Sequence, residues 1–177
     1  MLTRRSTLFA PLAALALGST PRSAFASQST DVRALRLLNL HTGESLEAEY
    51  WRAGAYAEDA LGAINHILRD HRTNEAHMMD ARLLDLLHEL AGALGTNRPF
   101  QVISGYRSPT TNAALADASG GVARRSLHME GMAIDIAMDG VSTETVRDAA
   151  LTLSRGGVGF YPNPGFVHVD VGRVRRW

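Results

Sequence analysis

The chain has 177 residues with 18 basic and 18 acidic side chains, and this balance gives no reason to expect nucleic acid as a partner. It has no cysteine, which excludes a thiol nucleophile, a cysteine zinc site and a disulfide framework. It also has no lysine, because every basic residue is arginine, and this excludes Schiff-base chemistry and a phosphate-loop lysine.

The first residues have the pattern of an export signal. Arg4 and Arg5 precede a largely apolar run over residues 8–17, and Ala-Phe-Ala at residues 24–26 provides the small residues of a cleavage site. The run is shorter than the about 20 apolar residues that span a bilayer. We therefore expect a signal peptide over residues 1–26 that is cleaved rather than kept as an anchor, and no stable membrane span after cleavage.

Export has consequences for the rest of the chain. Residues 27–177 form a segment of normal size for one domain, and we expect it to be periplasmic. Cleavage removes three arginines and no acid, which leaves 15 basic against 18 acidic residues and a net charge of about −3. The paired arginines also fit a twin-arginine signal, and the sequence leaves open whether that route or the general one is used.

The mature segment begins with two predicted strands. Residues 35–40 and 45–51 are rich in strand formers and flank a Thr-Gly-Glu turn. Residues 56–72 and 80–94 then carry apolar side chains at spacings of three and four, which predicts two amphipathic helices. Asp80 stands where it can cap the second helix.

The second half of the chain contains most of the predicted strands. In chain order we expect a strand at 100–104, a helix beginning at 109–112, a loop at 119–123, a strand at 132–136, a helix at 143–153, and strands at 158–161 and 166–171. The two long helices come first and most strands later, so the pattern indicates an α+β fold with helices packed on an antiparallel sheet, not a doubly wound sheet.

Two histidines and two acids occur within apolar, strand-like sequence. His128 precedes Gly131 and the apolar strand that contains Asp135, and His168 and Asp170 lie two residues apart on a second strand. An acid between apolar neighbours is buried without compensation unless it meets a cation or hydrogen-bond donors. Two imidazoles and a carboxylate suit a zinc site with an open fourth position, and the sequence therefore predicts a metal hydrolase.

The motif Ser-x-His-x-x-Gly-x-Ala-x-Asp at residues 126–135 resembles the signature of the zinc D-Ala-D-Ala metallopeptidases, which share a fold with the hedgehog signalling domain. With Ser-Gly-Tyr-Arg-Ser at residues 104–108 and His-Val-Asp-x-Gly at 168–172, the chain is similar to the YcbK/MepK-like branch, whose members are murein endopeptidases. The resemblance covers nearly the whole mature segment. It implies that His128, Asp135 and His168 bind Zn²⁺.

The general base is less clear from the resemblance. In related peptidases it is a Glu or His just before the last zinc ligand, but here Gly165 and Phe166 occupy those positions and cannot take a proton. Asp170 is the nearest replacement, either as the base or as a hydrogen-bond acceptor behind His168. A third interpretation makes Asp170 the ligand and His168 the base, and Glu130 is an outside candidate.

Three further residues are candidates for contact with the substrate. The resemblance gives Arg107 the part of a clamp on the substrate carbonyl or the developing oxyanion, where a fixed guanidinium stabilises negative charge. The alternative is a surface arginine paired with a helix acid. Ser126 and Asn112 are expected to orient site groups or to contact the peptide.

We therefore expect an exported zinc metallopeptidase that hydrolyses an amide bond in a peptidoglycan stem peptide or cross-link. The first alternative is a D,D- or L,D-carboxypeptidase that trims the end of a stem peptide. The second is a catalytically weak zinc- or murein-binding domain, which the missing Glu or His before His168 keeps open. The sequence does not determine the cleaved bond or the oligomeric state.

Overall fold

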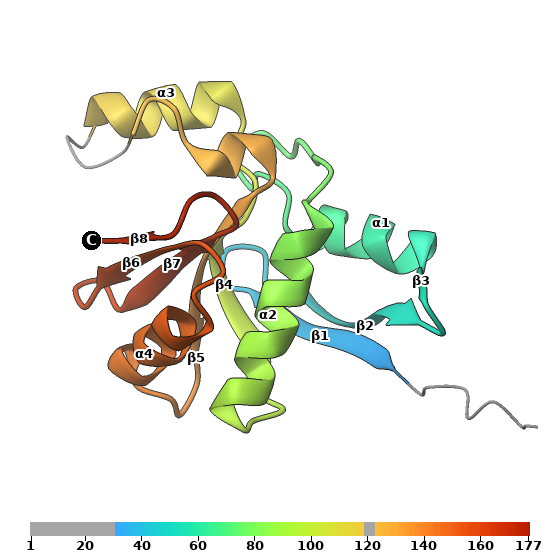
Figure 1. The fold of residues 1–177 in the computed structure, drawn as a ribbon. Coiled ribbons are helices and arrows are strands. Elements are labelled where there is room, and N and C mark those ends of the chain that lie inside the picture. Colours follow the sequence, from blue (N-terminus) through green and yellow to red (C-terminus); the bar gives the residue numbers. More distant parts are fainter. Residues whose placement is uncertain (1–30, 119–122) are drawn as a thin grey trace, which may run out of the picture.

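The computed structural model describes residues 31–118 and 123–177, and the predicted signal peptide and most of the predicted loop at 119–123 lie outside them. The strands form one eight-stranded sheet in the order β3-β2-β1-β4-β5-β7-β6-β8 (Figure 1). They span Val32–Asn39 (β1), Ser45–Arg52 (β2), Ala55–Tyr56 (β3), Phe100–Ser104 (β4), Ala133–Met138 (β5), Gly157–Tyr161 (β6), Phe166–Asp170 (β7) and Arg175–Arg176 (β8). The helices are α1 (Glu58–Ile67), α2 (Ala81–Leu94), α3 (Pro109–Ala118), the 3-10 turn η1 (Leu127–Glu130) and α4 (Thr143–Leu153).

The sheet is mostly antiparallel, which confirms the predicted α+β class. Neighbouring strands run antiparallel except for two pairs, β1 with β4 and β6 with β8. The short strands β3 and β8 were not expected from the sequence. Each has only two residues, and a two-residue segment carries no readable period, so its pairing depends on the strand it lies against.

Alternation along β5 and β7 separates a core face from a polar face. In β5 the side chains of Ile134 and Ile136 are fully buried in the hydrophobic core, and in β7 Val167 and Val169 join them. Asp135, His168 and Asp170 lie at the intervening positions, so they project from the opposite face of the sheet. In each strand the buried apolar side chains on one face therefore fix the position of the polar side chains on the other face.

Helices α2 and α4 pack on one another, and both contact the sheet (Figure 1). Helix α2 has a broad apolar face, and its buried residues are Leu83, Leu84, Leu86, Leu87 and Leu90. As predicted, Asp80 caps it, because the side chain accepts a hydrogen bond from the backbone N–H of Arg82. Among the described helices none is long and apolar enough to cross a membrane.

Helix α1 ends at Ile67, five residues before the end predicted from its apolar spacing. Asp70 provides the reason, since its buried carboxylate accepts hydrogen bonds from the backbone N–H groups of Arg72 and Ser108. An aspartate that binds nearby backbone N–H groups competes with helix formation. The chain after α1 therefore turns and is fixed against the start of α3.

Candidate metal centre

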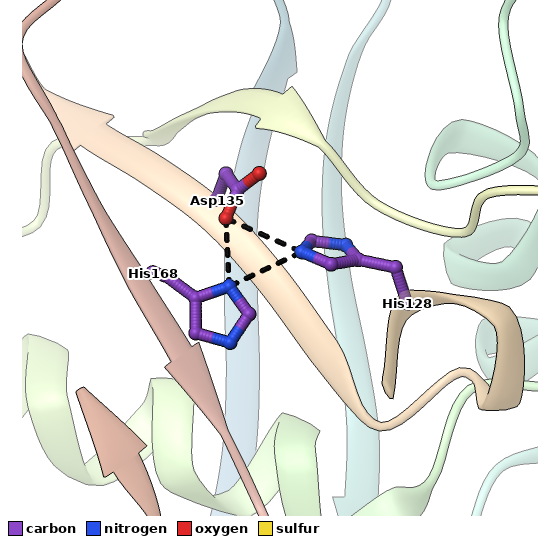
Figure 2. A group of neighbouring side chains, drawn as sticks. All are labelled: His128, Asp135 and His168. Carbon is purple, nitrogen blue, oxygen red and sulfur yellow. Dashed lines mark hydrogen bonds and ion pairs between the residues drawn. The ribbon is translucent and has the colours of Figure 1, made fainter. Parts of the chain in front are cut away.

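Three side chains predicted as zinc ligands converge on the polar face of the sheet (Figure 2). Asp135 on β5 and His168 on β7 are direct cross-strand partners. His128 comes from η1, whose first backbone N–H groups are capped by Ser126. The chain leaves η1 through Gly131, which has φ +66° and lies so close to Met78 that a Cβ there would be 2.3 Å from its carbonyl oxygen. Only glycine fits this turn.

The spacing of the three donor atoms fits a tetrahedral zinc ion. His168 Nδ1 lies 2.9 Å from Asp135 Oδ1 and 3.2 Å from His128 Nε2, and His128 Nε2 lies 3.3 Å from Asp135 Oδ1. Zinc bonds of about 2.0–2.1 Å in tetrahedral geometry put ligand atoms about 3.3 Å apart. Two nitrogens and a carboxylate oxygen are also the donor types of catalytic zinc sites.

Hydrogen bonds behind the two imidazoles decide which nitrogen faces the centre. His128 Nδ1 lies 2.7 Å from the carbonyl oxygen of Gly105, which can only accept, so this nitrogen carries the proton and Nε2 keeps its lone pair. His168 Nε2 lies 3.1 Å from Asp170 Oδ2, which leaves Nδ1 toward the centre. Partners of this kind fix the orientation and tautomer of metal-binding histidines.

The charges of the site also suit a cation. Burial lowers the pKa of His128, so its ring stays neutral, as a metal ligand must be. Burial by itself would raise the pKa of Asp135, but its contacts with the two histidines lower it below its ordinary value. Burial opposes protonation of His168, yet hydrogen bonds with Asp135 and Asp170 raise its pKa, so a metal there competes with a proton.

Arg107 lies beside Asp135 rather than on the outer surface. Its Nη2 forms an ion pair with Asp135 Oδ2, and its Nε donates to Ser104 Oγ at 2.9 Å. The register of β4 shifts between Val102 and Ser104, and this shift brings Ser104 opposite Asp135. The guanidinium is largely buried but still lines the cavity at the site.

Asp170 is fully buried behind His168. Its Oδ1 accepts from the backbone N–H groups of Gly157 and Gly172 at 3.0 and 2.9 Å, and both oxygens meet the guanidinium of Arg175. These donors, together with His168, lower its pKa although burial would raise it. Both carboxylate oxygens of Asp170 thus already accept hydrogen bonds from groups of the protein.

The other candidates from the sequence lie in different surroundings. Ser126 lines the cavity and also caps η1. Asn112 is 1% exposed, and its amide nitrogen donates to the carbonyl oxygens of Ala123 and Arg124, so it holds the loop that leads to the site. Glu130 is exposed and does not line the cavity.

The cavity at the centre has a volume of about 470 Å³. Its lining includes residues to which the sequence analysis gave no role in the site, namely Ala123, Arg125, Leu127, Tyr161, Phe166, Arg175 and Trp177. One of them had a signal in the sequence: a buried acid at position 170 needs a cation, and Arg175 is one of three arginines that follow it closely. Phe166 had one too, because it stands two residues before His168 on β7 and therefore shares its face. Tyr161 and Trp177 had none, because pairing with β7 and hydrogen bonds with β6 bring them to the cavity.

Comparisons with known proteins show which proteins this chain is similar to. A family model described as peptidoglycan L,D-endopeptidase MepK matches residues 27–177. The peptidoglycan L,D-endopeptidase MepK of Escherichia coli strain K12 is 46% identical over 169 residues, which cover 94% of this chain and 93% of that protein. The probable peptidoglycan L,D-endopeptidase MepK of Haemophilus influenzae is 40% identical over 166 residues, which cover 93% of this chain and 89% of that protein.

Proposed function

The chain belongs to the peptidoglycan L,D-endopeptidase MepK family, and we propose that it is an exported, zinc-dependent peptidase that hydrolyses amide bonds in peptidoglycan cross-links or stem peptides. The observation that carries the zinc dependence is the convergence of His128, Asp135 and His168 with donor spacings of 2.9–3.3 Å. The export pattern at the N-terminus supports action in the periplasm, where peptidoglycan lies.

His128 Nε2, Asp135 Oδ1 and His168 Nδ1 are the atoms that would hold the zinc ion. When bound there, zinc supplies Lewis acidity, which lowers the pKa of water and polarises an amide carbonyl. Two neutral imidazoles and one carboxylate leave the site with a net charge near +1, so it keeps its electrophilic character.

Arg107 stabilises the negative charge that develops on the amide oxygen. Its guanidinium lines the cavity while the Ser104 hydroxyl and the Asp135 carboxylate hold it in place. A donor fixed before the reaction needs no reorganisation when charge appears, and such donors are worth about 10²–10³ in rate. The same ion pair keeps Asp135 turned toward the two histidines.

Asp170 acts through His168 and not as the proton acceptor. Its two oxygens already accept from Arg175, from His168 and from backbone N–H groups, and the side chain has no exposed surface. A general base must come within about 3 Å of the proton that it takes. The carboxylate instead holds the His168 ring so that Nδ1 points to the centre.

The proposal is tested with purified mature protein, zinc and intact sacculi, by mass identification of the released muropeptides. An endopeptidase releases products of cross-link cleavage, whereas a carboxypeptidase releases single amino acids from stem peptides. His128→Ala is the matched control, and it should lose both zinc and turnover, because the remaining two ligands hold the metal weakly. Binding to sacculi without any release would identify a binding domain, and full zinc content in His128→Ala would refute the metal assignment.

A further inference from the structure

The cavity at the centre carries more positive than negative charge. Its charged lining residues are Arg107, Arg125, Arg175 and Asp135. Arg107 forms an ion pair with Asp135, and Arg175 forms one with Asp170 beneath the cavity wall. These pairs compensate two of the three guanidinium groups, and the charge of Arg125 remains.

Arg125 has no ion pair with any acid. Every Asp and Glu of the sequence lies within residues 31–118 and 123–177. All possible acidic partners of Arg125 therefore belong to the part of the chain that the structure describes. The neighbouring Arg124 differs, because it forms an ion pair with Asp117 at 3.3 Å and does not line the cavity. Two adjacent arginines thus have separate surroundings, one facing α3 and one facing the cavity.

The backbone on both sides of Arg125 is fixed. Before it, the buried amide of Asn112 donates to the carbonyl oxygens of Ala123 and Arg124 at 3.1 and 3.2 Å. After it, Ser126 caps the turn that carries His128. Arg125 therefore stands three residues before a candidate metal ligand on a segment anchored to α3, although its side chain is exposed. Because its backbone is held in place, the Arg125 side chain can reach only a limited region, and that region includes the cavity.

We propose that Arg125 binds a carboxylate of the substrate and makes the cleft selective for peptides with a free carboxylate near the cleaved amide. The planar guanidinium suits a carboxylate, which it binds with two parallel N–H···O bonds. A neutral amide in the same place offers only one acceptor oxygen and leaves the positive charge of the cleft uncompensated. This inference rests on the proposed peptidase function and adds the feature by which its substrate is chosen.

The test uses two cross-linked peptides that differ only in whether the carboxylate next to the scissile amide is free or amidated. The zinc-loaded protein should cleave the free acid with a kcat/KM about 10-fold or more above that of the amide, chiefly through KM, since only the carboxylate forms two parallel hydrogen bonds with the guanidinium and neutralises its charge. Arg125→Gln should lose this preference, whereas Arg125→Lys should keep part of it. Zinc content and melting temperature should stay unchanged in both variants.

Arg124→Gln is the matched control and should keep the full preference, because Arg124 lies outside the cavity. Calorimetric binding of both peptides to the same preparations gives a second reading that does not need turnover. If neither peptide is cleaved but the acid binds more tightly and Arg125→Gln removes the difference, the peptidase function fails and the Arg125 assignment stands. Equal binding and cleavage of both peptides by the unaltered protein, or a preference that survives in Arg125→Gln, would overturn the assignment.

Discussion

Asp170 and Arg175 form an ion pair behind the candidate metal centre, and Asp170 in turn hydrogen-bonds to His168. The fully buried carboxylate of Asp170 needs a cation, and the guanidinium of Arg175 supplies it. Its two terminal nitrogens donate to the two carboxylate oxygens at 3.0 and 2.7 Å. Removing one partner of a buried pair leaves an uncompensated charge, which costs several kcal/mol. The carboxylate therefore serves the stability of the fold as well as the orientation of His168.

Asp170→Asn separates orientation of His168 from proton transfer. An orienting role predicts that zinc affinity falls by about 10- to 100-fold, together with the melting temperature, because the amide cannot serve both His168 and Arg175 as an acceptor. A base would instead leave zinc affinity intact and lower turnover of the zinc-saturated enzyme by about 100-fold or more. Zinc titration, thermal unfolding and turnover are measured on one preparation, with the exposed Asp139→Asn as control.

At the scale of elements, Asp70 joins the turn after α1 to the start of α3. Burial by itself would raise its pKa, but hydrogen bonds from Thr111, Ser108 and Arg72 lower it to about 2 from an ordinary value of 3.8. The ionised form is thus stabilised by folding. The contribution of the ionised Asp70 carboxylate to the free energy of unfolding is fully present above about pH 4 and is lost as the pH falls through 2.

Asp70→Asn should lower the free energy of unfolding at pH 6 by about 2 kcal/mol, because a depression of the pKa by nearly two units corresponds to that energy. The difference between the two proteins should shrink as the pH falls from 5 to 2, where the unaltered carboxyl group becomes neutral. Urea unfolding at several pH values measures it. Asp117→Asn in α3 is the control, since that side chain is 67% exposed, and a pH-independent difference would contradict the linkage.

The absence of a side chain at Gly159 lets the end of the described chain, after β8, pack closely on strand β6. Trp177 lies across Gly159 of β6, where a Cβ would be 2.7 Å from the indole ring, and Gly159 is in turn the cross-strand partner of His168. The indole also donates to the Tyr161 hydroxyl at 2.8 Å and lies 5.2 Å from the His168 ring between centroids. The close approach lets an aromatic side chain reach the cavity beside the candidate metal.

Gly159→Ala should displace Trp177 and lower the stability by about 1–3 kcal/mol, the usual cost of forcing atoms into a packed contact. Thermal unfolding measures the loss, and tryptophan fluorescence reports the displacement. Gly62→Ala in α1 is the control, because a Cβ there meets nothing within 4 Å, and it should raise the stability by about 0.5–1 kcal/mol. An unchanged melting temperature and spectrum in Gly159→Ala would show that the indole is not held against β6.

For the molecule as a whole, export is the prediction that lies outside the described residues. The paired arginines, the apolar run and the Ala-Phe-Ala sequence predict a mature protein that begins near Ser27 in the periplasm. N-terminal sequencing of protein from the native envelope checks this. Recovery of chains with intact Met1 from the cytosol would contradict it, and replacing Arg4 and Arg5 with Lys should block export only if the twin-arginine route is used.

Local patterns were enough to predict most elements and the three side chains that meet at the candidate metal centre. The period-two alternation placed Asp135, His168 and Asp170 apart from their apolar neighbours, because successive side chains of a strand must point to opposite faces. Spacings of three and four located α2, and its Asp80 cap followed from residue type and position. These features depend on neighbours close in the chain, which the sequence displays directly.

Tertiary structure decided what depends on distant neighbours. The early end of α1 comes from Asp70 binding the backbone of Ser108, and the pairing of Asp135 with His168 comes from the register of β5 against β7. Arg125 and Trp177 reach the cavity only because α3 holds one loop and β6 holds the last residues. Such contacts join residues 11 to 38 positions apart in the chain, and strand register and packing, not local propensity, determine which of them form.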